Sequence, residues 1–240
     1  MNYNELNFDA MTRERELSMS AAFPVLMRKV YVWMTLALVI TGITAYGVAS
    51  SPGVISALYS NQAIMWGLII AEFALVIGIS AAINRLSLPT ATMLFVLYSA
   101  INGVMLSSVF LIYTASSIAS VFFITAGTFA VMAFIGYTTK TDLTSMGKII
   151  MMALIGLIIA SLVNVFLVKS SGFDLILSYV GVLIFVGLTA YDSQKIKQML
   201  LEAPDAGEGA QKLALLGALS LYLDFINLFI YLLRIFGKRE

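Results

Sequence analysis

The sequence contains no cysteine and no histidine, and only 11% of its 240 residues are charged. Without cysteine, the chain has no disulfide, no thiolate metal site and no thiol nucleophile. Without histidine, it lacks the commonest catalytic base and the usual zinc and haem ligand, which excludes intramembrane zinc proteases and serine–histidine hydrolases in their usual forms. Any chemistry therefore depends on carboxylates, hydroxyls, amides, lysine and arginine.

Apolar residues, in contrast, make up 60% of the chain. A soluble domain is about 45–50% apolar and about 25% charged, so this composition predicts that much of the surface faces lipid. Six or seven helices of about 20 residues would use most of the chain, which leaves room for a single all-α integral membrane domain. The net charge of +1 gives no reason to expect a nucleic-acid partner.

Seven apolar stretches follow a polar, mixed-charge N-terminal segment over residues 1–29. The first stretch begins only after Arg28 and Lys29, too late for the apolar core of a cleaved signal peptide, so we expect it to be retained. Each stretch can cross about 30 Å of hydrocarbon as a helix. The predicted transmembrane domain covers 30–236 and precedes a basic tail, 237–240, with spans at about 30–49, 62–83, 91–113, 118–137, 149–168, 175–194 and 213–236.

Lysine and arginine predict the orientation of the spans. With the N-terminus in the cytosol, ten of these residues lie on the inside and four on the outside, as the positive-inside rule requires. An odd number of spans then places the basic C-terminal tail outside. A re-entrant last span, which would return the tail to the inside, is the alternative.

Three acidic residues lie within predicted spans: Glu72, Asp192 and Asp224. A carboxylate near the bilayer centre costs about 2.5–3.5 kcal/mol on insertion scales, so such residues are candidates for function. Residues 192 and 224 are equidistant from position 208, in the loop that joins spans six and seven. Because helices rise about 1.5 Å per residue, the two aspartates are expected at the same depth and facing each other.

Two other interpretations compete with this pair. Asp192 could form an ordinary helical ion pair with Lys195, three residues later. The small or polar residues of span seven recur every three or four positions and could form either a packing seam or a polar pathway; they are Gly217, Ser220, Asp224, Asn227 and Tyr231. Asn102 and Asn164 are expected to hydrogen-bond between helices.

Paired carboxylates can do three kinds of work. They can share a proton and activate water, as in an aspartic protease. They can bind a hard cation such as calcium, or they can act as a pH-dependent latch. Two carboxylates underfill a calcium shell of six to eight oxygens, so Asp192 and Asp224 would bind calcium weakly and transiently. With histidine absent, a pH response near neutrality depends on carboxyl groups.

Two segments resemble the Bax inhibitor-1 family, the transmembrane Bax inhibitor motif proteins. They are LTAYDSQKIK, from Leu188 to Lys197, and SLYLDFINLF, from Ser220 to Phe229, with the likeness continuing to Arg234. The resemblance implies a seven-helix bundle whose last helix is surrounded by the first six. It also implies a non-enzymatic calcium leak, regulated by pH through an aspartate pair that corresponds to Asp192 and Asp224.

The resemblance has further implications. Some relatives add an arginine of the second span to the aspartates; here an apolar residue stands at the corresponding position, and Arg85 comes only at the span's end. The supporting polar residues are then Glu72, Arg85, Lys195, Ser220, Asn227 and Tyr231. The chain's brevity is that of bacterial members, which lie in the cytoplasmic membrane and in some cases interact with membrane proteases.

Three other functions use the same features. A cation/proton exchanger would load the same carboxylates alternately. A modulator of membrane proteases or stress responses would act by binding partners, with residues 1–29 as one contact. A presenilin-type aspartyl protease also has aspartates on spans six and seven, but Leu221–Leu223 lacks its glycines and no proline follows in the last helices.

Overall fold

The computed structural model describes residues 3–203 and 207–239, with side chains from Ala21 onward. The regular secondary structure in this part of the chain is helical, apart from an isolated bridge between Tyr113 and Arg239. The helices are α1 (Tyr3–Ala49), α2 (Pro52–Ser60), α3 (Gln62–Ala82), α4 (Leu88–Leu106), α5 (Val109–Ile112), α6 (Ala115–Thr138), α7 (Thr144–Val163), a π-helical turn (Asn164–Val168), α8 (Ser171–Leu201) and α9 (Glu208–Phe236).

Seven of the described helices are long and apolar enough to span a membrane, which confirms the predicted all-α bundle. The helix of the first span, α1, continues back through the polar N-terminal segment to Tyr3. The short helices α2 and α5 and the π-helical turn did not follow from the hydropathy pattern. Helix α2 lies in the connection between the first two spans, whereas α5 and the π-helical turn lie at the ends of the third and fifth spans, where their apolar residues continue the hydropathy of the span.

Polar residues between the spans start the helices. The side chains of Asn61, Ser87, Thr114 and Ser170 each accept a hydrogen bond from a backbone N–H in the first turn of the following helix. Such caps satisfy donors that a helix start otherwise leaves unpaired. Asn164 does not join separate helix faces as expected; it bonds the backbone N–H and C=O of Ser170 and thereby closes the turn into α8.

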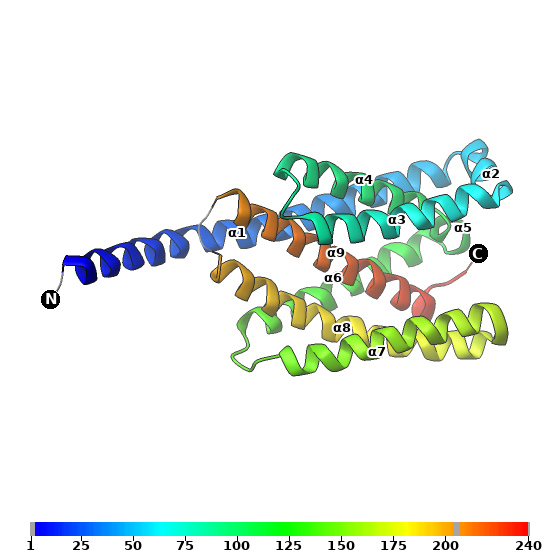
Figure 1. Cartoon of the computed structure of the whole chain (residues 1–240). Coiled ribbons are helices and arrows are strands. Elements are labelled where there is room, and N and C mark those ends of the chain that lie inside the picture. The colour runs from blue at the N-terminus through cyan, green and yellow to red at the C-terminus, as the bar shows by residue number, and fades with distance from the viewer. Residues whose placement is uncertain (1–2, 204–206, 240) are drawn as a thin grey trace.

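Helix α9 lies at the centre of the bundle (Figure 1). In its most apolar 18 residues 67% are buried, against 6% for α3. It packs chiefly against α1, α4, α6 and α8, whereas α3 packs on α4 and α7 on α8. The last helix is therefore central, with four helices around it directly and two in an outer layer.

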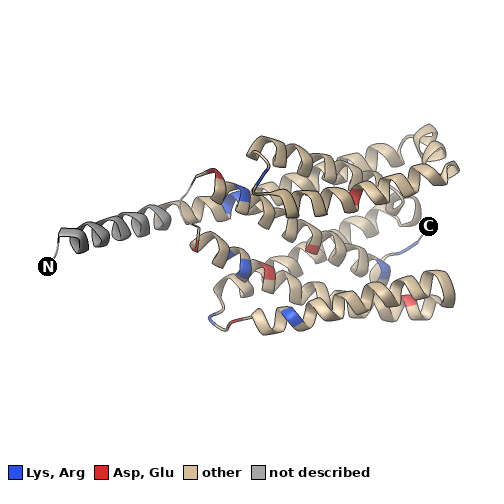
Figure 2. Ribbon diagram, viewed as in Figure 1, with Lys and Arg blue, Asp and Glu red and all other residues tan. Residues whose placement is uncertain are grey.

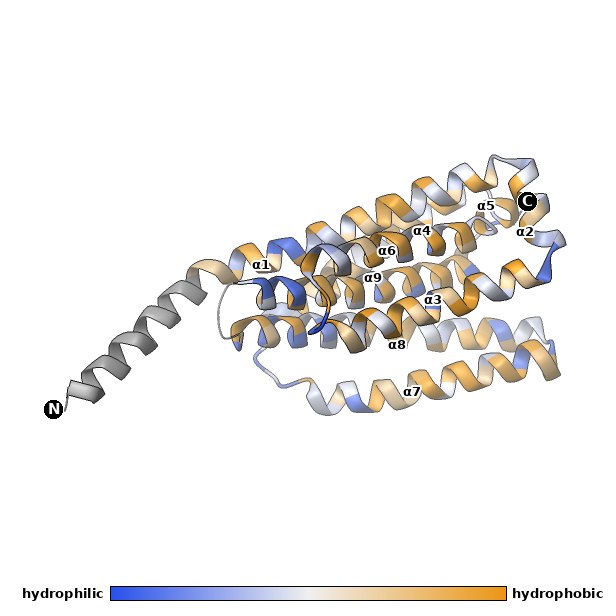
Figure 3. Ribbon diagram, turned by 45° about the horizontal axis from the view of Figure 1, so that its top comes forward, coloured by the Kyte–Doolittle hydropathy of each residue, from blue (hydrophilic) through white to orange (hydrophobic). Residues whose placement is uncertain are grey.

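The outer surface of the bundle is apolar and its polar residues gather toward the ends of the helices (Figure 3). Large apolar side chains that lipid would cover include Phe123, Phe134, Ile149 and Leu183, each at least 63% exposed. Charged residues likewise lie mostly toward the two ends of the bundle (Figure 2). This arrangement is the one that a hydrocarbon solvent requires.

Helix α9 crosses the whole bundle without interruption, so the re-entrant alternative is wrong. It begins at the end that holds the α3–α4 and α6–α7 connections and finishes at the opposite end, beside the C-terminus (Figure 1). There the tail is fixed by backbone contacts: the N–H of Lys238 donates to Ser117 Oγ at 2.9 Å, and its C=O accepts from the N–H of Thr114 at 3.1 Å.

Candidate functional site

Asp192 of α8 and Asp224 of α9 lie on neighbouring antiparallel helices, close enough for their charges to interact directly. Asp224 is buried, with 4% of its surface exposed, and Asp192 is half-buried. The structure thus brings together the two residues that the hairpin geometry pairs. They lie between α9, which is the most enclosed helix, and α8, which contacts α9 more extensively than any other helix does.

The Oδ2 atom of Asp224 is buried and has no hydrogen-bond partner among the described residues. A buried polar atom without a partner costs about 1–3 kcal/mol, and more if it is charged. Neither of the two ion pairs formed by described residues involves either aspartate. Asp224 is therefore a carboxyl group held in the core without an ion-pair partner among the described residues.

The part of α8 around Asp192 is held firmly against α6 and α7. The side chain of Gln194 accepts from the N–H of Leu143 at 2.8 Å and donates to the C=O of Thr141 at 2.8 Å. Lys197 Nζ donates to the C=O of Tyr137 at 2.9 Å. These bonds fix α8 to the α6–α7 connection and leave its α9-facing side to the aspartate pair.

The pair suits a proton or a passing cation better than a standing metal site. Two neighbouring carboxyl groups can share one proton in a hydrogen bond, whereas two negative charges repel each other or require a cation. No group of three or more acidic residues that could hold a metal ion exists in the described part of the chain. Calcium takes six to eight oxygens, so carbonyl groups and water would have to complete its shell.

The profile of the family described as "Inhibitor of apoptosis-promoting Bax1" matches residues 24–240. The chain belongs to the Bax inhibitor-1 family. The match covers all seven spans and both aspartates, so it confirms the relationship that the segments in α8 and α9 predict.

Bacterial members of the Bax inhibitor-1 family are similar along nearly the whole chain. The inner membrane protein YbhL of Escherichia coli strain K12 is 51% identical over 222 residues, which cover 92% of this chain and 94% of YbhL. A protein of Borreliella burgdorferi is 48% identical, covering 89% of this chain and 92% of its own length. A Rickettsia prowazekii protein is 45% identical, covering 89% of both chains.

The small and polar residues that recur along α9 face α8, and most of them make packing contacts. The ring of Tyr231 covers Gly181 of α8 and stacks on Phe185 with centroids 5.9 Å apart. Gly217 packs against the side chain of Ile196. Asn227 donates to the C=O of Leu223 in its own helix at 2.8 Å, and Ser220 is half-buried.

The two basic residues proposed to support the pair have different positions. Lys195 is exposed one turn from Asp192, where its charge reaches the carboxylate without forming an ion pair, and its Nζ lies 5.8 Å from the Tyr191 ring centroid. Arg85 is exposed in the α3–α4 connection and makes no ion pair with any described residue. A supporting role of Arg85 stays a prediction; this arginine follows the last turn of α3, which packs on α4 in the outer layer.

Glu72 belongs to a separate buried network. Asn102 Nδ2 donates to Glu72 Oε1 at 3.1 Å, and the Tyr222 hydroxyl donates to Asn102 Oδ1 at 3.1 Å. The same hydroxyl lies 2.7 Å from Thr41 Oγ1, which donates to the C=O of Ser99 at 2.9 Å. The network joins α3, α4, α9 and α1, and reaches α9 only two residues before Asp224.

Sequence reasoning missed Tyr222 and Thr41. Tyr222 is fully buried and also makes edge-to-face contacts with Phe95 and Tyr98. A signal was present, because a tyrosine hydroxyl buried in a membrane helix needs a partner. The partner itself was not predictable, since Thr41 and Tyr222 are 181 positions apart.

Proposed function

We propose that this protein is a non-enzymatic, pH-sensitive leak for calcium, in which protonation of Asp192 and Asp224 controls the contact between α8 and α9. The observation on which the proposal depends is the buried Asp224, whose Oδ2 is unpartnered beside a second carboxyl group. An unpaired buried carboxylate is costly, so it is more often retained for function than for stability.

A proton and a cation compete for this pair. When one proton is held between the carboxyl groups, they can bond to each other and stabilise the α8–α9 contact. When both are charged, they repel each other unless a cation lies between them. Calcium would therefore pass by binding briefly to Asp192 and Asp224, with water and backbone carbonyls as its other ligands.

The membrane topology that goes with this proposal places the N-terminus in the cytosol. Eight basic residues with described side chains lie at the end of the bundle where the α8–α9 connection is found, against four at the other end, which matches the positive-inside rule. YbhL is named as an inner membrane protein, so the cytoplasmic membrane of a bacterium is the proposed location.

The test is calcium uptake by the full chain in proteoliposomes, measured while the external pH is stepped through neutrality, because two carboxyl groups with interacting charges titrate as a pair. Asp192→Asn and Asp224→Asn should each change the flux and abolish most of its pH dependence. Asp174→Asn is the matched control, since Asp174 lies in an exposed ion pair with Arg234 at 3.1 Å. An unchanged pH profile in both core variants would contradict the proposal.

A cation/proton exchanger is the second candidate, because the same buried pair could load protons and cations alternately. Reversal of the current at the calcium equilibrium potential indicates a leak, whereas a reversal that moves with the proton gradient indicates exchange.

Cleavage of a transmembrane peptide that is lost in Asp192→Asn would instead support the presenilin-type protease. If wild-type vesicles carry no calcium, a modulator of membrane proteases or of other membrane proteins becomes the better explanation.

A further inference from the structure

A groove runs along the outside of the bundle between α1 and α6. These two helices make no extended contact with each other, because both pack on α9, which forms the floor at Phe225. The main part of the groove has a volume of about 610 Å³. A smaller pocket of about 100 Å³ continues it toward α5 and shares Leu38, Phe122 and Phe225 with it.

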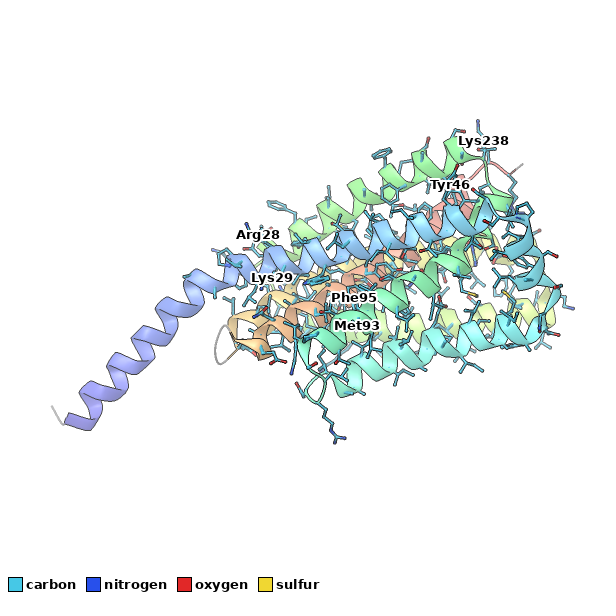
Figure 4. All side chains as sticks on the ribbon, turned by 90° about the horizontal axis from the view of Figure 1, so that it is seen from above. Arg28, Lys29, Tyr46, Met93, Phe95 and Lys238 are labelled. Carbon is cyan, nitrogen blue, oxygen red and sulfur yellow. The ribbon has the colours of Figure 1, made fainter. Side chains whose placement is uncertain are left out.

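Aromatic contacts join α1 to α6 and to α5 near the two ends of the groove, and the groove is open at its side. Phe23 of α1 stacks on Tyr137 of α6 at one end, with ring centroids 6.4 Å apart. Tyr46 of α1 contacts Phe110 of α5 at the other, with centroids 6.0 Å apart. Figure 4 shows α1 and α6 running alongside each other, with Arg28 toward one end and Tyr46 and Lys238 toward the other. The open side of the groove therefore faces the hydrocarbon of the bilayer.

The lining is apolar except near one end, where a positive charge lies. Arg28 lines the groove there, is exposed and forms no ion pair with the described residues. Lys197 lies beside the same end, with its Nζ 5.0 Å from the Tyr137 ring centroid. The hydroxyl-bearing residues Tyr31, Thr35 and Tyr137 complete this polar end. An arginine fork without a carboxylate partner is well suited to binding a phosphate group.

From these features we infer that the groove binds an anionic phospholipid, with one acyl chain between α1 and α6 and the headgroup phosphate at Arg28. Its volume falls within the range of about 300–1,000 Å³ that is usual for small-molecule sites. A transmembrane helix of about 10 Å diameter and 30 Å length occupies roughly 2,400 Å³, several times more than the groove. The inference does not depend on calcium transport, and its test measures lipid alone.

The test is native mass spectrometry of the full chain, purified in detergent and supplied with dioleoylphosphatidylglycerol or dioleoylphosphatidylcholine. We expect the wild type to retain one phosphatidylglycerol in preference to phosphatidylcholine. Arg28→Gln should reduce that preference about fivefold, the value of one basic residue at an anionic membrane surface. Arg85→Gln, an exposed arginine at the same end of the bundle and outside the groove, should leave it unchanged.

A second pair of variants tests the acyl-chain site. Ala130 lines the groove, so Ala130→Trp should fill it and abolish retention of both lipids. Ala153→Trp, at an exposed position of α7, is the matched control and should retain lipid. If Ala130→Trp does not fold, a benzophenone attached to Ala130→Cys should crosslink the retained lipid, and the same label at Ala153→Cys should not; the chain's lack of cysteine makes each label unique.

Three results would overturn the inference. The first is equal retention of the two lipids by the wild type and by Arg28→Gln. The second is lipid retained by folded Ala130→Trp, or no crosslink from Ala130→Cys. The third is that the wild type forms a dimer and no lipid-bound monomer, and that Ala130→Trp dissociates this dimer. That result would show that a second copy of the chain covers the groove.

Discussion

Tyr222 is the residue at which buried hydrogen bonds from α1, α4 and α9 meet. Its hydroxyl contacts both Thr41 and Asn102, and Asn102 in turn bonds Glu72 of α3. In hydrocarbon these groups have no water to replace a lost partner. The network therefore contributes to holding the α1–α4 side of the bundle against the central helix, independently of the aspartate pair on the α8 side.

We expect Tyr222→Phe to lower the free energy of unfolding by about 1–2 kcal/mol, because Asn102 Oδ1 loses its donor while the ring packing remains. Tyr59→Phe is the control, since Tyr59 is 48% exposed on α2. Each purified variant is heated in detergent, and size-exclusion chromatography then measures the fraction of protein that stays folded. Equal stability of the two variants would show that the hydroxyl has no net effect.

Asp142 lies outside the spans, two residues before α7 begins, and it bonds the first residue of that helix. It accepts hydrogen bonds from the side-chain hydroxyl and the backbone N–H of Thr144, at 2.6 and 2.9 Å, and these bonds lower the pKa of its carboxyl group below the ordinary value. A lowered pKa in the folded state means that the contribution to stability is present above the ordinary pKa and is lost as the pH falls through the folded value.

Thr144→Val should therefore raise the pKa of Asp142 toward its ordinary value, because the hydroxyl donor is the larger cause of the shift. The pKa is measured from the pH dependence of the carboxyl carbon resonance in labelled protein. Thr139→Val serves as a comparison, since Thr139 Oγ1 accepts from the N–H of Thr141 and does not contact Asp142. A titration that is identical in wild type and Thr144→Val would contradict this assignment.

At the scale of helices, close approach between elements depends on glycines. Gly136 of α6 lies directly against the backbone of Ala190 in α8, where an added Cβ would collide with the carbonyl group. Gly103 of α4 lies in the same way against the backbone of Thr41 in α1. In lipid, such small residues let helices pack closely where no hydrophobic driving force operates between them.

Gly136→Ala should separate α6 from α8 and cost about 1–3 kcal/mol of stability, since backbone atoms cannot move aside as a flexible side chain can. Gly127→Ala, on the same helix, should be neutral or slightly stabilising, because its Cβ would meet open space and alanine favours the helix. Thermal unfolding of both variants in the same detergent compares them. Equal melting temperatures would exclude a tight α6–α8 contact at Gly136.

On the scale of the whole molecule, the positions of the connections imply which charged residues share a side of the membrane. Arg85 and Lys140 lie in connections at the end where α9 begins, and Lys169 and Lys238 at the end where it finishes. All four side chains are exposed. They provide labelling positions on both faces of the bundle.

Because the chain has no cysteine, a single cysteine at each of these positions reports its side without a background signal. With the cytosolic N-terminus proposed above, a membrane-impermeant maleimide should label Lys169→Cys and Lys238→Cys in intact cells, but Arg85→Cys and Lys140→Cys only after lysis. Labelling of Lys140→Cys and Lys238→Cys from the same side would contradict a fully spanning α9. The opposite pattern throughout would invert the proposed orientation.

The sequence by itself determined the seven spans, their order and the family, and it predicted that Asp192 and Asp224 lie at equivalent heights on two adjoining helices. These features depend on hydropathy along the chain and on the constant rise of a helix, and both are local. Tertiary structure alone decided which helices surround α9, that Glu72 bonds through Asn102 to Tyr222, that Arg85 forms no ion pair with a described residue, and that a groove separates α1 from α6. The reason is that lipid and a neighbouring helix are about equally apolar, so hydropathy does not reveal which face of a membrane helix meets which partner.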